Sequence, residues 1–106
     1  MQKSAMLKLE IYVPVTHFDA LAQALRDASA GVVGNYDSVL SYSKVMGTWR
    51  PLPGADPYDG EIGILQQGEE YKVETTCSAD ILESVIAAIR AAHPYEEPVI
   101  HAIELV

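Results

Sequence analysis

The chain has 106 residues, of which 49% are apolar and 21% charged, the proportions of a single soluble globular domain. Its net charge of −8 opposes binding to the phosphate backbone of nucleic acids, and the sequence contains no basic stripe. No segment is apolar for the length that a membrane helix needs, and the single cysteine, Cys77, excludes an internal disulfide. The composition therefore predicts one cytosolic domain, residues 1–106, that binds neither membranes nor nucleic acids.

The first third of the chain has the pattern of a strand followed by a helix. Residues 7–13 alternate between apolar and polar side chains, which indicates a half-buried strand, and Pro14 is expected to end it. Thr16 is predicted to cap the following helix, and Gly31 is predicted to stop it. The apolar stripe of this helix consists of Phe18, Leu21, Ala22 and Leu25.

The middle of the chain is rich in glycine, proline and aromatic residues. Residues 38–49 favour a strand weakly, with Gly47 as a predicted bulge. A long Gly/Pro-rich loop is expected at about residues 47–60, and shaped loops of this kind often carry binding sites. Strand material is then predicted at 61–65 and 70–76, on either side of a turn at 66–68.

The last third repeats the pattern of helix and strand. Ser78 is predicted to cap a helix, and Pro94 is predicted to end it. The apolar face of this helix consists of Ile81, Leu82, Val85, Ile86 and Ile89. Residues 99–106 are predicted to form the final strand.

The order of elements predicts a ferredoxin-like βαββαβ fold, an α+β architecture with a four-stranded antiparallel sheet and both helices on one face. Tyr12, Tyr42 and Tyr71 are predicted to lie on the uncovered face of the sheet. Exposed apolar sheet faces are commonly buried by self-association. We therefore expect a homo-oligomer.

Four motifs occur in an order that points to a known family. They are G-x-x-G-N-Y-D at 31–37, G-T-W-R-P at 47–51, G-A-D-P-Y-x-G at 54–60 and A-H-P-Y-E-E-P at 92–98. Together they closely resemble the inserted YqfO-type domain of the NIF-three-like family, over residues 7–105. One position departs from the family, which often has His-Cys after N-Y-D where this chain has Ser38 and Val39.

The resemblance implies a CutA/PII-like ferredoxin fold, and a trimer as the favoured oligomer. Full-length bacterial members carry a dinuclear metal centre in a larger flanking domain, and this chain is expected to be the insert alone. None of the family's metal ligands can therefore be assigned to residues of this chain, and a hydrolase activity should not be inherited.

His93, Glu96, Glu97 and His101 bring imidazole and carboxylate groups close together in the sequence. Such groups bind divalent metal ions, and His93, Glu96 and Glu97 are the candidate ligands. Their spacing matches no standard metal motif. His93 could instead interact with the end of the preceding helix, and the two glutamates could be solvated turn charges.

Six residues are candidates for binding a small molecule. Asn35, Tyr36 and Asp37 could line the mouth of a cleft, or they could serve only as turn residues. Trp49 and Tyr95 could line the same pocket, and Arg50 could hold an anionic group. Trp49 could alternatively fill a subunit interface, where large aromatic residues concentrate. Cys77 is expected to be a small buried residue rather than a reactive thiol.

These observations favour a non-catalytic regulatory or ligand-binding module, with a site near the 31–60 loop and the His93–Pro98 segment. A partner protein is compatible with this interpretation. Two alternatives remain open. One is a small acid/base enzyme that uses His93, Asp37 or Glu96, and the other is a purely structural assembly domain.

Overall fold

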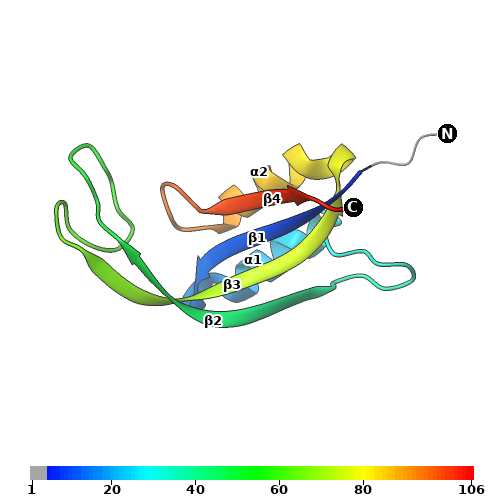
Figure 1. Cartoon of the computed structure of the whole chain (residues 1–106), viewed down its shortest axis with the longest axis horizontal. Coiled ribbons are helices and arrows are strands. Elements are labelled where there is room, and N and C mark those ends of the chain that lie inside the picture. Colours follow the sequence, from blue (N-terminus) through cyan, green and yellow to red (C-terminus); the bar gives the residue numbers. More distant parts are fainter. Residues whose placement is uncertain (1–4) are drawn as a thin grey trace.

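The computed structural model describes residues 5–106, and its elements follow the predicted order (Figure 1). Strand β1 (Met6–Pro14), a 3-10 turn (Val15–His17) and helix α1 (Phe18–Asp27) precede strand β2 (Leu40–Trp49). Strand β3 (Gln66–Ser78), a second 3-10 turn (Ala79–Ile81), helix α2 (Leu82–Ala92) and strand β4 (Ile100–Glu104) follow. No helix in the described part of the chain is long and apolar enough to cross a membrane.

The four strands form one sheet in the order β2-β3-β1-β4, and each neighbouring pair is antiparallel. Both helices cover the same face of this sheet (Figure 1). The central strands β1 and β3 pair continuously from Met6 opposite Ser78 to Pro14 opposite Glu70. This arrangement confirms the predicted ferredoxin-like fold.

The core lies between the sheet and the two helices. The alternation of β1 directs Leu7, Leu9, Ile11 and Val13 toward the helices, and all four are buried. They pack with buried residues of β3 and of the two helices, which are Val73, Cys77, Leu21, Leu25, Val85 and Ile89. Burial raises the pKa of the Cys77 thiol, as expected for an inert core cysteine.

Two of the three tyrosines predicted for the uncovered face lie on the other face. Directly opposed residues share a face of the sheet, and Tyr71 is opposite the buried Val13, while Tyr42 is opposite the buried Val73. Both rings pack against Phe18 of α1, with centroid distances of 4.3 Å for Tyr42 and 5.2 Å for Tyr71. The prediction is therefore correct for Tyr12 alone.

Charged side chains dominate the centre of the uncovered face. Lys8 and Lys72 each lie within 3.3–3.6 Å of Glu10 and Glu74, and His101 Nδ1 lies 3.7 Å from Glu10. Partial burial would raise the pKa of Glu10, but the two lysines lower it overall. We refer to this group of five residues below as the open-face charge network.

The structure also corrects two details of the strand prediction. Gly47 pairs with Gly68 in a continuous register, so β2 has no bulge there. Residues 61–65 are not a strand, because Gly63 has a φ of +79° and its amide donates to the Pro51 carbonyl at 2.7 Å, which folds the segment back. The predicted turn at 66–68 is instead the beginning of β3.

The ends of α1 differ from the prediction as well. Thr16 lies within the 3-10 turn, the N-cap position of α1 belongs to His17, and no side chain caps the helix, so the Thr16 prediction is wrong. The helix ends before Ser29, which has a φ of +67°, while the Ser29 and Ala30 amides donate to the Arg26 and Leu25 carbonyls. Ser29, rather than Gly31, therefore occupies the left-handed position of a Schellman motif. Before α2, Ser78 accepts the Asp80 amide and caps the 3-10 turn Ala79–Ile81, whereas α2 has Ile81 at its N-cap and no side-chain cap, so the Ser78 prediction holds for the turn and not for the helix.

Strands β2 and β3 continue past the end of β1, as a two-stranded arm. Residues 46–49 pair with residues 66–69, whereas the last residue of β1, Pro14, is opposite Glu70. This arm carries the long loop 50–65 and helps to give the molecule its extended dimensions of 52 × 23 × 23 Å (Figure 1). The arm therefore places the loop beside the segment 93–99, which precedes β4.

Candidate functional site

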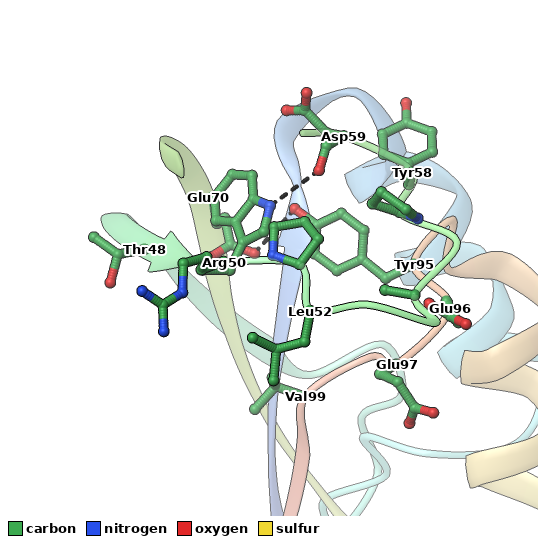
Figure 2. A pocket seen from close by; sticks show the side chains of 14 residues that line it. Thr48, Arg50, Leu52, Tyr58, Asp59, Glu70, Tyr95, Glu96, Glu97 and Val99 are labelled. Carbon is green, nitrogen blue, oxygen red and sulfur yellow. Dashed lines mark hydrogen bonds between the residues drawn. The ribbon is translucent and has the colours of Figure 1, made fainter. Parts of the chain in front are cut away.

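A cavity of about 390 Å³ lies where loop 50–65 meets the segment 93–99 (Figure 2). Its volume is within the range of cavities that bind small molecules. The wall is formed by Thr48, Trp49, Arg50, Pro51, Leu52, Ala55, Pro57, Tyr58, Asp59, Glu70, Tyr95, Glu96, Glu97 and Val99. Most of these residues belong to the two segments that the sequence marks as unusual.

Two contacts hold the loop and the segment together. The Asp56 amide donates a hydrogen bond of 3.0 Å to Glu96 Oε2, and the rings of Tyr58 and Tyr95 lie 5.9 Å apart. Tyr58 also contacts His17 edge to face at 5.7 Å, which connects the loop to the turn before α1. The cavity is therefore shaped by contacts between segments that are distant in the sequence.

Trp49 ends strand β2 and forms one wall of the cavity. Its Nε1–H donates to the Asp59 carbonyl at 3.0 Å, as the dashed line in Figure 2 shows. Gly60 has a φ of +106°, and a Cβ at this residue would crowd Trp49 Nε1 and the Gln66 side chain. The glycine therefore lets the loop return closely over the indole ring.

Glu70 and Tyr95 form the polar part of the cavity wall. The Tyr95 hydroxyl donates to Glu70 Oε2 at 3.2 Å, and Glu70 is only 8% exposed. Burial, and next the neighbouring Glu70 carboxylate, raise the pKa of Tyr95 far above its usual value, so its hydroxyl stays protonated. A Cβ at Gly47 would collide with this carboxylate, so the glycine leaves the space that Glu70 fills.

His93 is buried behind the cavity wall and supports it. Its Nε2 lies 2.6 Å from the Tyr12 carbonyl, and its Nδ1 accepts the Tyr95 amide at 3.2 Å. These bonds require a neutral ring with the proton on Nε2. Burial lowers the pKa of His93, which outweighs the opposite effect of the Tyr12 carbonyl.

The structure does not assemble the predicted metal ligands into one group. Both nitrogens of His93 have partners, Glu96 accepts the Asp56 amide, and His101 lies on the open face beside Glu10. Among residues 5–106, no three His, Cys, Asp or Glu side chains are placed to hold a metal ion. Metal binding by His93, Glu96 and Glu97 stays a prediction.

Of the six residues predicted to bind a small molecule, Trp49, Arg50 and Tyr95 line the cavity. In Figure 2 the Arg50 guanidinium extends away from Tyr95, on the opposite side of the cavity from Glu96 and Glu97. Within the described chain, the Arg50 side chain forms no hydrogen bond or ion pair. It therefore contributes a cation at the rim.

Asn35, Tyr36 and Asp37 lie at the other end of the sheet. They precede β2, whose ten residues separate them from Trp49 by about 30 Å at the usual rise per residue. Val33 and Tyr36 exchange backbone hydrogen bonds of 2.8 and 3.0 Å, and Asp37 accepts the Ser38 hydroxyl. Within one chain these residues form a turn and do not reach the cavity.

Glu70 is a polar residue of the cavity wall that lies outside both unusual segments and that the sequence did not identify. Its place in the alternation of β3 groups it with Lys72 and Glu74, which are more exposed, so the pattern predicts a solvated side chain. It is buried because Tyr95, which is 25 residues away, covers it. The alternation of a single strand carries no signal of such a contact.

No family model matches the chain. Among curated proteins, it is 42% identical over 94 residues to a GTP cyclohydrolase 1 type 2 homolog of Halalkalibacterium halodurans, which covers 89% of this chain and 25% of that protein. A second protein of this name, from Bacillus subtilis, is 38% identical over 90 residues, 85% of this chain and 24% of that protein. The chain thus spans about a quarter of the length of these relatives.

Solved structures also resemble the chain, one of them in sequence and fold and others in fold only. A Bacillus cereus protein related to NIF3 superposes with a TM-score of 0.87 at 36% identity, over 99% of this chain and 27% of that chain. CutA from Archaeoglobus fulgidus gives a TM-score of 0.69 at 15% identity, over 94% of this chain and 83% of that chain. Bacillus subtilis GlnK gives a TM-score of 0.65 at 20% identity, over 96% of this chain and 86% of that chain. At these low identities, the likeness to CutA and GlnK shows a shared fold alone. The chain therefore resembles the YqfO-type domain of the NIF-three-like proteins, with a CutA/PII-like fold, as its four motifs predict.

Proposed function

We propose that the chain is a ligand-binding module that holds a small molecule in the cavity between loop 50–65 and segment 93–99. The observation that carries the proposal is the cavity itself, whose wall combines Trp49, Tyr58 and Tyr95 with a few polar groups. Rings supply contact area, and polar groups orient a ligand. In a module of this kind, an occupied cavity would signal to a partner protein or to a second copy.

Self-association is a second part of the proposal. Strands β2 and β4 are the two edges of the sheet, so each has one side without a strand partner in the described chain. The face opposite the helices is also uncovered (Figure 1). Unpaired edges and open faces favour assembly of copies, and a trimer is the form that the family resemblance favours.

Catalysis is the weaker alternative. The relatives are named as cyclohydrolase homologs, but this chain spans about a quarter of them, and their activity belongs to the whole proteins. Of the three candidate acid/base groups, His93 is buried with both nitrogens bonded, and Asp37 lies at the far end of β2 from Glu96. Asp37 and Glu96 therefore do not face one substrate within one chain, which gives an acid/base pair of these two groups less support than ligand binding.

A divalent metal ion is an alternative occupant of the cavity, because Glu96 and Glu97 both line it. His93 could join them only by releasing the Tyr12 carbonyl or the Tyr95 amide. Isothermal titration with zinc tests this alternative. Heat that disappears in a Glu96→Gln/Glu97→Gln variant would support it, and an unchanged titration would exclude these ligands.

The ligand-binding proposal can be tested with a fragment screen by NMR. Trp49 is the only tryptophan in the chain, so one indole N–H signal reports on the cavity. We expect small aromatic fragments to shift this signal in the wild-type protein. Absence of any shift across the screen would contradict the proposal.

A cavity-filling variant supplies the control. Val99→Phe places a ring at the cavity wall and should abolish the fragment-induced shifts. Val32→Phe is the matched control, because Val32 is 50% exposed and Val99 is 47% exposed, and Val32 lies in the turn before β2. Equal fragment binding by Val99→Phe and the wild type would place the binding elsewhere.

A further inference from the structure

The cavity has an unbalanced distribution of charge. Its wall contains four carboxylates, those of Asp59, Glu70, Glu96 and Glu97, but a single cation, Arg50. The guanidinium extends away from Tyr95, so it does not neutralise the interior (Figure 2). The loop that covers the cavity adds Asp56 and Glu61 and no further cation. The residues that line the cavity therefore carry more negative than positive charge.

Glu70 is the part of this wall that most needs a positive partner. It is 8% exposed, and within residues 5–106 it forms no ion pair. Its hydrogen bond from Tyr95 is a contact with a neutral group. A carboxylate removed from water without a cation is costly, and a cation that reaches it gains a strong, charge-assisted hydrogen bond.

The aromatic part of the wall fits the same kind of ligand. Trp49, Tyr58 and Tyr95 surround the cavity beside Glu70, and the faces of aromatic rings attract cations. Leu52 and Val99 add an apolar surface between Arg50 and Glu97 (Figure 2). A ligand with an apolar body and a positively charged group would satisfy all of these surfaces.

We propose that the cavity is specific for organic cations, such as primary amines on a small apolar or aromatic body, with the ammonium group directed at Glu70. This inference rests on the proposed ligand-binding function and names the chemical class of the ligand. The ammonium group would supply the positive partner that Glu70 lacks. The rings would enclose the body of the ligand.

The test compares three probes of similar shape and different charge, which are phenethylamine, 2-phenylethanol and phenylacetate. Each is titrated against the full chain, and the shift of the Trp49 indole signal is measured. We expect the amine to bind about tenfold more tightly than the alcohol, since a desolvated charge-assisted hydrogen bond adds on that order. Phenylacetate should bind more weakly than either.

Substitutions of single charged residues identify the carboxylate that gives the cavity its preference for the amine. Glu70→Gln preserves the shape and the Tyr95 contact, and it should reduce amine affinity about tenfold while the alcohol is unaffected. Glu97→Gln, at the exposed rim, should cause a smaller loss, and it tests the charge even if Glu70→Gln fails to fold. Glu83→Gln, on the exposed side of α2, is the matched control and should change nothing. Arg50→Gln should strengthen amine binding slightly.

The outcomes separate this inference from the function on which it rests. Equal binding of the amine and the alcohol would overturn the cation specificity and leave the ligand-binding function in place. Tighter binding of phenylacetate that is lost in Arg50→Gln would overturn the cation specificity in favour of an anion. No response to any of the three probes would overturn both.

Discussion

Tyr95 connects the segment before β4 to the only buried carboxylate in the described part of the chain, that of Glu70. Tyr95→Phe removes the donor but keeps the ring. We expect the free energy of unfolding to fall by about 1–3 kcal/mol, because Glu70 then lacks the side-chain partner that satisfies it. Urea denaturation measures the change. Tyr36→Phe removes a hydroxyl from a residue that is 74% exposed, so it should have almost no effect.

His93 should make the stability depend on pH. Burial lowers its pKa below the ordinary value of 6.5, so the unfolded chain binds a proton more readily than the folded chain. The stabilisation is complete above about pH 6.5, and it is lost as the pH falls from there toward the folded pKa. Thermal unfolding between pH 8 and pH 5 should show this decline.

The His93→Gln variant should be less stable at pH 8, because the Tyr12 and Tyr95 contacts change, but its stability should vary less with pH. His101→Gln is the control, since the His101 side chain is 54% exposed on the open face. An unchanged pH slope in His93→Gln would show that another group is responsible.

At the scale of the element, the end of α1 contains a residue that is poorly suited to its conformation. Ser29 has a φ of +67° at the left-handed position of the Schellman motif, where glycine avoids the steric cost of a Cβ. We expect Ser29→Gly to stabilise the protein by several tenths of a kcal/mol, and about 1 kcal/mol at most. Differential scanning calorimetry measures the increase in Tm.

The matched control places the same change inside a helix. Ser84→Gly in α2 should destabilise the protein by about 0.5 kcal/mol, because glycine has the lower helix propensity. A loss of stability in both variants would show that the Ser29 side chain makes a contribution larger than the strain.

The elements of the fold were predictable wherever a local pattern determines them. The alternation of residues 7–13 and the apolar face of α2 led to correct elements, because each pattern describes burial on one side. The arm and its loop were predicted less well. Residues 61–65 have the composition of a strand, but the hydrogen bond from the Gly63 amide to the Pro51 carbonyl, twelve residues earlier in the chain, folds them back. Thr16 failed as a cap because it lies within a 3-10 turn, so that His17 takes the N-cap position of α1.

At the scale of the whole molecule, the candidate site was predictable in part. Trp49 and Tyr95 were identified from unusual local composition, and the fold brings them to one cavity. Asn35–Asp37 were grouped with them only because they are near Trp49 in the sequence, and the length of β2 separates them. Glu70 was missed because its burial depends on the packing of a distant segment over the sheet.

The open-face charge network offers a test of self-association. Lys72 contacts Glu10 and Glu74. The hydrogen bond with Glu74, and next the charge of Glu10, raise the pKa of Lys72, so the lysine stays charged. Lys72→Glu would place a third carboxylate beside these two. In an isolated chain the cost should be modest, because exposed ion pairs contribute about 0–1 kcal/mol. In an oligomer that buries this face, the repulsion would be desolvated and much stronger.

We therefore expect light scattering to show an oligomer for the wild type and a shift of Lys72→Glu toward the single-chain mass of 11.5 kDa. Lys44→Glu is the matched control. Its ion pair with Glu69 lies on the other face of the sheet, because Lys44 is opposite Tyr71, and both side chains are about 60% exposed, so the oligomer should persist. If both variants keep the wild-type mass, the open face lies outside the interface and the free edges of β2 and β4 become the surfaces to mutate. A wild-type chain that is monomeric at all concentrations would contradict the self-association proposal itself.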